Sequence, residues 1–166
     1  AKSTAVLFTR GYNSEKLIGQ RKLRMNGGDI EWCKGVKYLG VYLDNRLRFT
    51  QHIKNRIKAS KKALFRYKGL VGAKWGPSPL LMKWLWTGVV RPALSYAAPI
   101  WMSVTSQISI QKELRRLNRL GALAISPVRR GTPTAGLEVI THLPPLDLFI
   151  QEAAVQAKPR IDQSFR

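Results

Sequence analysis

Short runs in the first part of the chain are rich in apolar, β-branched and aromatic residues, and the two runs around Asn-Gly alternate between polar and apolar residues, patterns typical of β-strands. These runs cover residues 4–9, 22–25, 29–33 and 36–43. The second and third flank Asn26, Gly27 and Gly28, and Asn-Gly between such runs is a strong hairpin signal. Asp44 and Asn45 then predict a turn. Residues 1–44 are therefore expected to be β-rich.

After Leu47 the apolar positions recur at helical spacing instead. A helix is expected from Thr50, as its N-cap, to about Lys68, because one stripe of the helical wheel is apolar: Ile53, Ile57, Leu64, Tyr67 and Val71. The same reasoning predicts helices over residues 80–90, 107–125, 132–140 and 146–157. Pro92 and Pro99 are expected to kink or split the helix that starts near residue 80, and Pro159 to end the last helix.

The order of these elements, strands first and then only helices, predicts an α+β chain. We expect a small antiparallel β-hairpin region followed by a mostly α-helical bundle, with the change of character near residues 44–50. The expected segments are residues 1–49, 50–104 and 105–166.

Composition narrows the class of protein. The chain has 166 residues and 45% of them are hydrophobic, which argues against a disordered basic tail. No apolar stretch reaches the roughly 18 residues of a membrane span. No signal peptide opens the chain and Cys33 is the single cysteine, so we expect an intracellular location, nuclear and cytoplasmic. The chain starts at Ala1 rather than at a methionine, which favours a fragment or a processed piece.

The charge of the chain is strongly one-sided. Lys and Arg number 29 against 9 Asp and Glu, which gives a formal net charge of +20. From Asn45 to Lys112 there is no carboxylate but there are 13 cations. A surface without a polyanionic partner usually intersperses both signs, so this segregation predicts binding to a polyanion, with nucleic acid as the leading candidate. An anionic membrane surface, or charge that serves solubility alone, are the alternatives.

Residues for catalysis are sparse. His52 and His142 have no His or Cys partner at helical spacing and Cys33 has no companion thiol, so no zinc site is expected. The close carboxylate pair Asp29 and Glu31 would share one face of a strand, and we interpret it as a solvated hairpin edge. No nucleophile motif and no phosphate-binding glycine loop occurs. From its residues alone the chain is a binder with no active site, metal or cofactor of its own.

Two groups of cations are the candidate nucleic-acid-binding residues. In the predicted helix 50–68, Phe65 lies among the cations and offers a ring for stacking on bases or sugars, with packing against a neighbouring subdomain as the alternative. In the second group, Arg119 has the alternative of pairing with an acid elsewhere. The tryptophans at positions 75, 84, 86 and 101 are expected to be core or interface anchors. The candidates are Lys54, Lys58, Lys61, Lys62, Phe65 and Arg66, followed by Arg115, Arg116, Arg119, Arg129 and Arg130.

Four stretches resemble motifs of non-LTR retrotransposon reverse transcriptases. Residues 1–10 resemble an Asn-Pro-x-Lys-Thr-x-x-x-Phe-Thr segment that follows the catalytic Asp-Asp motif of that family. Residues 36–53 are similar to its block KYLGVxLDxxLxWxxHI, which holds the primer-grip hairpin and the entry to the thumb, although Phe49 stands where Trp is common. Residues 92–101 resemble PxLxYGxxxW, with Ala98 near where Gly is common. Residues 132–148 resemble the block TTPTxALExLxGxPPLDL, found before an RNase H domain in jockey-like elements.

This resemblance implies the end of a palm, a thumb-like helical bundle and a connecting segment of an RNA-directed DNA polymerase. It places Tyr38, Leu39 and Gly40 near the primer 3′ end and the helix after Thr50 along the template–primer duplex. The catalytic aspartates of the family, with their Mg²⁺, would precede Ala1, so the chain alone is expected to be inactive. The implied partners are RNA, DNA or an RNA–DNA hybrid and an upstream polymerase domain, with no membrane. The alternatives are a stand-alone nucleic-acid-binding module or a protein-interaction scaffold derived from such an element.

Overall fold

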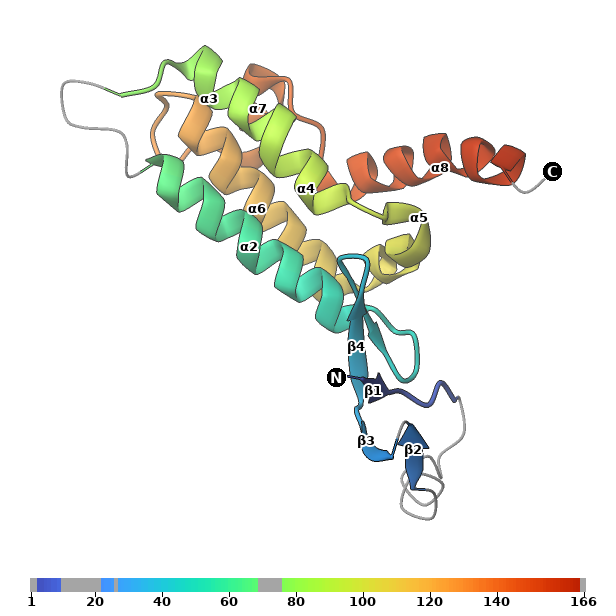
Figure 1. Ribbon diagram of the computed structural model, residues 1–166. Coiled ribbons are helices and arrows are strands. Elements are labelled where there is room, and N and C mark those ends of the chain that lie inside the picture. Colours follow the sequence, from blue (N-terminus) through green and yellow to red (C-terminus); the bar gives the residue numbers. More distant parts are fainter. Residues whose placement is uncertain (1–2, 10–21, 26, 69–75, 165–166) are drawn as a thin grey trace. The chain divides into compact units, whose positions relative to one another are not determined.

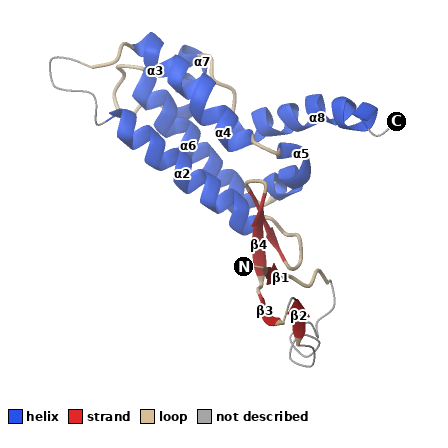
Figure 2. Ribbon diagram, viewed as in Figure 1, coloured by secondary structure: helices blue, strands red, loops and turns tan. Residues whose placement is uncertain are grey.

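The computed structural model describes residues 3–9, 22–25, 27–68 and 76–164 (Figure 1). The chain forms two compact units, Ala1–His52 and Ile53–Arg166. Figure 2 shows that the strands all belong to the first unit, whereas the second unit is helical. The expected α+β class, with small antiparallel pairings followed by helices, is confirmed.

The first sheet of the N-terminal unit has the strand order β1-β3-β2. Strands β2 (Leu23–Met25) and β3 (Gly28–Trp32) pair antiparallel, as the Asn-Gly signal predicted, and Gly27 between them has a positive φ of 79°. Strand β1 is shorter than expected, because only Thr4–Ala5 pairs, parallel to β3.

The prediction of a single strand over residues 36–43 was wrong. The structure has two antiparallel strands, β4 (Gly35–Tyr38) and β5 (Val41–Asp44). The chain reverses at Leu39 and Gly40, whose φ angles are 46° and 84°. Two successive positive φ angles make a tight turn whose twist suits a hairpin. The sequence over residues 38–43 is apolar on both sides of this turn, so the pattern of hydrophobic residues conceals it.

Helix α2 (Thr50–Lys68) has the predicted bounds, but its entry differs from the expected cap. Asp44 accepts backbone N–H bonds from Arg48 at 3.1 Å and from Phe49 at 2.9 Å. The hydroxyl of Thr50 instead donates to the Arg48 carbonyl. A few residues on, the buried His52 accepts the Tyr42 N–H at Nδ1, which ties the start of α2 to β5.

The second unit continues with α3 (Pro79–Leu85), a π-helical turn (Trp86–Val90) and α4 (Arg91–Ser95). The predicted division of this helix into pieces is what the structure shows, and Pro92 lies in the first turn of α4, a separate piece from α3. The π-helical turn precedes it, and the Arg91 N–H bonds the Trp86 carbonyl five residues back. A short α5 (Ala98–Trp101), with Pro99 in its first turn, and a 3₁₀ turn (Met102–Ser106) follow.

The remaining helices are α6 (Ile108–Ile125), α7 (Thr134–Thr141) and α8 (Leu146–Ser164). The expectation that Pro159 ends the last helix was wrong, because α8 continues through it. Proline removes one backbone donor, and the carbonyl that loses it belongs to Val155, an exposed residue that water can reach. The core of the unit gathers apolar side chains from α2 to α8, among them Ile57, Trp86, Leu94, Trp101, Leu114, Leu117, Leu137 and Ile150.

Candidate nucleic-acid interface

Helix α2 separates apolar and basic side chains sharply. Ile53, Ile57 and Leu64 are buried, while every fourth residue from position 54 carries an exposed cation. Because a helix rises about 1.5 Å per residue, these cations follow one another at intervals of about 6 Å. The helix contains no carboxylate to neutralise them. We call this set the α2 row: Lys54, Lys58, Lys62 and Arg66.

Two further candidates flank the α2 row. Lys61 is half-buried, so its position is less open than those of the row. Phe65 leaves 56% of its surface exposed, although its ring is apolar. Its packing against another part of the chain, which the sequence left open as the alternative, is therefore at most partial in the described structure. An aromatic ring exposed among cations is the arrangement that stacks on nucleic-acid bases.

The tip of the β4–β5 hairpin presents the three residues that the resemblance placed near a primer end. Tyr38 is 64% exposed and Leu39 is 73% exposed, and Gly40 completes the turn. Tyr38 pairs with Val41 across the two strands, which places it at the last pair before the turn. An exposed tyrosine and leucine at a hairpin tip can form an apolar contact surface for a sugar or a base.

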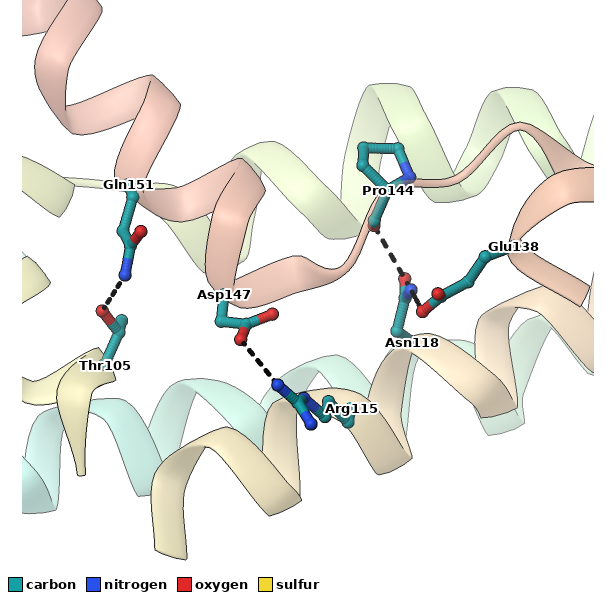
Figure 3. A network of polar contacts seen from close by, with 7 residues as sticks. All are labelled: Thr105, Arg115, Asn118, Glu138, Pro144, Asp147 and Gln151. Atoms are coloured by element: carbon teal, nitrogen blue, oxygen red, sulfur yellow. Dashed lines mark hydrogen bonds and ion pairs between the residues drawn. The ribbon is translucent and has the colours of Figure 1, made fainter. Parts of the chain in front are cut away.

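The arginines of α6 differ in how far the fold engages them. Arg116 is exposed and has no ion pair or hydrogen bond within the described residues. Arg115 lies 3.7 Å from the buried carboxylate of Asp147, the pair drawn in Figure 3. That distance is long for a charge-assisted bond, so Arg115 keeps most of its donors for other acceptors.

Arg119 is engaged by the loop that follows α6. Its guanidinium donates to the carbonyls of Arg130 at 2.6 Å and Thr132 at 2.8 Å, and to the Thr134 hydroxyl at 2.9 Å. The open alternative of an acidic partner is thus not what the structure shows. Arg129 and Arg130 of the same loop are exposed. Arg119 holds this basic loop against α6, and Arg129 and Arg130 present the charge.

Sequence reasoning missed a polar network beside these arginines. Figure 3 shows Asn118 of α6 directed at Glu138 of α7 and at the Pro144 carbonyl, with its Nδ2 3.0 Å from the Glu138 carboxylate and 3.3 Å from the carbonyl. Gln151 of α8 similarly bonds Thr105 at 3.4 Å. The signal that could have found Asn118 is its place on the apolar stripe of α6, where a polar residue needs a partner.

Arg91 was also missed, because a buried cation has no distinct sequence signature. Its guanidinium lies 3.7 Å from the centre of the Phe149 ring, a cation–π contact between α4 and α8. Burial lowers the pKa of Arg91 below its ordinary value, and the charge of Glu152 acts in the opposite direction and raises it. This cation stabilises helix packing and is too buried to belong to a surface site.

The tryptophans divide into two kinds. Trp86 and Trp101 are buried core residues. Trp84 is 64% exposed on α3, next to Leu80 and Leu81, which are exposed as well. Trp75, like the predicted stripe residue Val71, lies outside the described residues.

The close carboxylate pair Asp29 and Glu31 lies exposed on strand β3. Asp29 pairs with Arg24 at 3.0 Å on the exposed edge of the β2–β3 hairpin, as the sequence interpretation expected of a solvated edge. Within residues 3–9, 22–25, 27–68 and 76–164, no three His, Cys, Asp or Glu side chains are placed to hold a metal ion. In the same residues no helix has the length and apolarity to cross a membrane.

Comparison with known proteins identifies relatives. The chain is 29% identical over 139 residues to a 115 kDa protein of the type-1 retrotransposable element R1DM of Drosophila melanogaster. It is 24% identical over 132 residues to the retrovirus-related Pol polyprotein of type-1 retrotransposable element R1 3 of Nasonia vitripennis. These alignments cover 82% and 74% of the chain.

The chain spans only 13% of the first relative and 34% of the second. No family model matches the chain, and no solved structure matches it significantly. The expected relationship is nevertheless confirmed at the level of the retroelement: the homologues of this chain are proteins of R1 non-LTR retrotransposons.

Proposed function

We propose that the chain is the part of a retroelement reverse transcriptase that grips the template–primer duplex. The observation that carries the proposal is the α2 row, a line of exposed cations on a helix without a carboxylate. The relatives support the retroelement context, because one of them is a Pol polyprotein. The catalytic aspartates and their Mg²⁺ belong, in this proposal, to an upstream polymerase domain.

The α2 row suits a nucleic-acid backbone better than base edges. Lysine ammonium groups are point charges that neutralise phosphates without reading sequence. The spacing of about 6 Å offers repeated contacts along one strand of a duplex. The exposed ring of Phe65 adds a stacking face for an unpaired base or a sugar at the edge of the row. The expected ligand is therefore an RNA–DNA hybrid or a duplex of related shape, bound through phosphate and sugar.

The test is a salt titration of duplex binding by the full chain. The observed affinity should fall with salt in a log–log plot whose slope is about −0.9 per phosphate contacted. A double variant, Lys58→Gln with Lys62→Gln, should reduce the magnitude of this slope by about two, because each lost contact contributes about one. The control is Lys22→Gln with Lys158→Gln, which removes the same charge from exposed positions outside α2. Equal slopes for the two double variants would contradict the proposed role of α2.

A protein-interaction scaffold is the second candidate function. The observation that favours it is the cluster of exposed apolar side chains on α3, where Leu80 is 78% exposed and Trp84 is 64% exposed. Soluble proteins rarely expose neighbouring large apolar residues unless something covers them. Scaffolding alone predicts nucleic-acid binding that is absent or independent of salt, so the titration above separates the two functions.

A further inference from the structure

A hollow of about 420 Å³ lies between α6 and α7 in the second unit. Its volume falls within the range of small-ligand sites, and four of its seven lining residues carry a charge. Such a lining suits a small anion with several acceptor oxygens better than an apolar molecule. The side chains that matter here are Arg115, Arg116, Arg119, Thr134, Ala135 and Glu138.

The charge of this lining is positive. Three arginines face Glu138 in the lining, and the buried Asp147 beside Arg115 is a second carboxylate, so one positive charge remains in excess. The Glu138 carboxylate is further engaged, because its Oε1 accepts the Asn118 amide at 3.0 Å (Figure 3). An anion entering the hollow would therefore meet three guanidinium groups, with Glu138 in the lining and Asp147 beside Arg115 as the opposing carboxylates.

The three arginines would have different roles in such a site. Arg119 donates hydrogen bonds to two carbonyls of the loop and to the Thr134 hydroxyl, and so positions the start of α7. Arg115 is held loosely by Asp147 at 3.7 Å (Figure 3). Arg116 has no partner among the described residues, so its whole planar fork is available for a bidentate contact with an oxyanion.

The first turn of α7 supplies further donors at the same hollow. The residue before the helix is Pro133, and no side chain caps the helix start. The N–H groups of the first turn of a helix have no intrahelical acceptor. The Thr134 hydroxyl accepts a bond from Arg119 and donates none within the described residues, so its hydrogen is also available.

We propose that this hollow binds a single phosphate group of a nucleic acid, with Arg116 as the direct ligand, Arg115 as a second cation and Arg119 as the positioning residue. The inference rests on the proposed function for the identity of the ligand, and it adds a discrete pocket to the linear α2 row. The phosphate is either an internal phosphodiester of the bound strand or a terminal phosphomonoester. Both present the oxyanion that the guanidinium fork and helix N-terminus recognise.

The first experiment titrates the full chain with sodium phosphate by calorimetry, against sodium chloride at equal ionic strength. Arg116→Gln should weaken inorganic phosphate binding by about tenfold or more, as expected for loss of charge-assisted bonds. The matched control is Lys112→Gln, which removes an exposed cation four residues away on the same helix but outside the hollow. If Arg116→Gln binds phosphate as tightly as Lys112→Gln does, the proposal is overturned.

A second variant keeps the proposal testable if Arg116→Gln fails to fold. Ala135→Glu places a carboxylate in the first turn of α7, where an acid stabilises the helix, and directs it toward the arginines. We expect this variant to be at least as stable as the wild type in denaturant and to lose phosphate binding. Unchanged phosphate affinity in a stable Ala135→Glu protein would also overturn the proposal.

Oligonucleotides then identify the source of the phosphate. A preference for a 5′-phosphorylated over a 5′-hydroxyl duplex that Arg116→Gln abolishes assigns a terminal phosphate. An equal loss of affinity for both duplexes assigns a backbone phosphate. If duplex binding depends on the α2 row while Arg116→Gln changes neither phosphate nor duplex affinity, the pocket fails and the proposed function stands. If Arg116 matters for inorganic phosphate but no duplex binds, the anion pocket is real and the proposed function fails.

Discussion

At the scale of single residues, Arg116 and Arg119 of α6 have different structural roles although their side chains are chemically the same. Arg119→Gln should destabilise the chain by about 1–3 kcal/mol, because the carbonyls of Arg130 and Thr132 lose a charged donor. Arg116→Gln should change the free energy of unfolding by less than about 0.5 kcal/mol, since its side chain is exposed and makes no hydrogen bond or ion pair within the described residues. Urea unfolding followed by circular dichroism measures both, and equal effects would contradict this division of roles.

Phe65 provides a second prediction at this scale, for binding rather than stability. Phe65→Ala should weaken binding to single-stranded or frayed nucleic acid by about 1–3 kcal/mol, the value of one base–aromatic stack. Phe65→Tyr keeps the ring and should bind like the wild type. Because the side chain is 56% exposed, neither variant should unfold the protein. Fluorescence anisotropy with a labelled strand decides the matter: if alanine and tyrosine bind equally well, Phe65 does not stack.

At the scale of elements, the packing of α6 on the π-helical turn depends on Gly121. A Cβ at position 121 would lie 2.7 Å from three ring carbons of the buried Trp86. Gly121→Ala should therefore destabilise the second unit by about 1–3 kcal/mol through overpacking. Gly88→Ala is the matched control, because its Cβ meets nothing within 4 Å and alanine is the better helix former. Thermal unfolding should rank Gly88→Ala at or above the wild type and Gly121→Ala clearly below it.

A comparison of the helices and strands with their predictions shows which elements the sequence can predict. The bounds of α2 and the end of α6 agree with the prediction because long amphipathic helices repeat their signal over several turns. The hydrophobic pattern missed the β4–β5 turn because the sequence is apolar on both sides of Leu39 and Gly40, although the family resemblance implied a hairpin in this block. The division of the helix near Pro92 was predicted, but the π-helical turn before it was not, because such a turn has no sequence signature.

The candidate site was predictable to the extent that it lies on one helix. The α2 row follows from a helical wheel, since all of its members share α2. The hollow at Arg116 cannot be predicted from a helical wheel. It forms only because the start of α7 lies beside the middle of α6, a contact between residues about twenty positions apart. Nor does the sequence tell which arginine the loop carbonyls engage. Pairings between elements and the direction of long side chains are what the structure adds.

At the scale of the whole molecule, the net charge of +20 and the carboxylate-free stretch from Asn45 to Lys112 determine the kind of binding expected. Lysine and arginine contacts to phosphate and sugar carry no sequence information directly. We therefore predict that the full chain binds two RNA–DNA hybrids of equal length and unrelated sequence with affinities within about threefold, since base-edge contacts would contribute about 1–3 kcal/mol each.

This prediction also constrains how variants behave. Loss of α2-row cations should weaken binding to both hybrids by the same factor, because each removed cation neutralises a phosphate that every sequence has. The measurement is a parallel anisotropy titration of wild type and Lys58→Gln/Lys62→Gln at two salt concentrations. A difference of a hundredfold between the hybrids, or a variant that loses one hybrid and keeps the other, would mean that the chain reads bases. The even distribution of exposed cations along α2, without an asparagine or glutamine in the row itself, argues for shape and charge as what the molecule recognises.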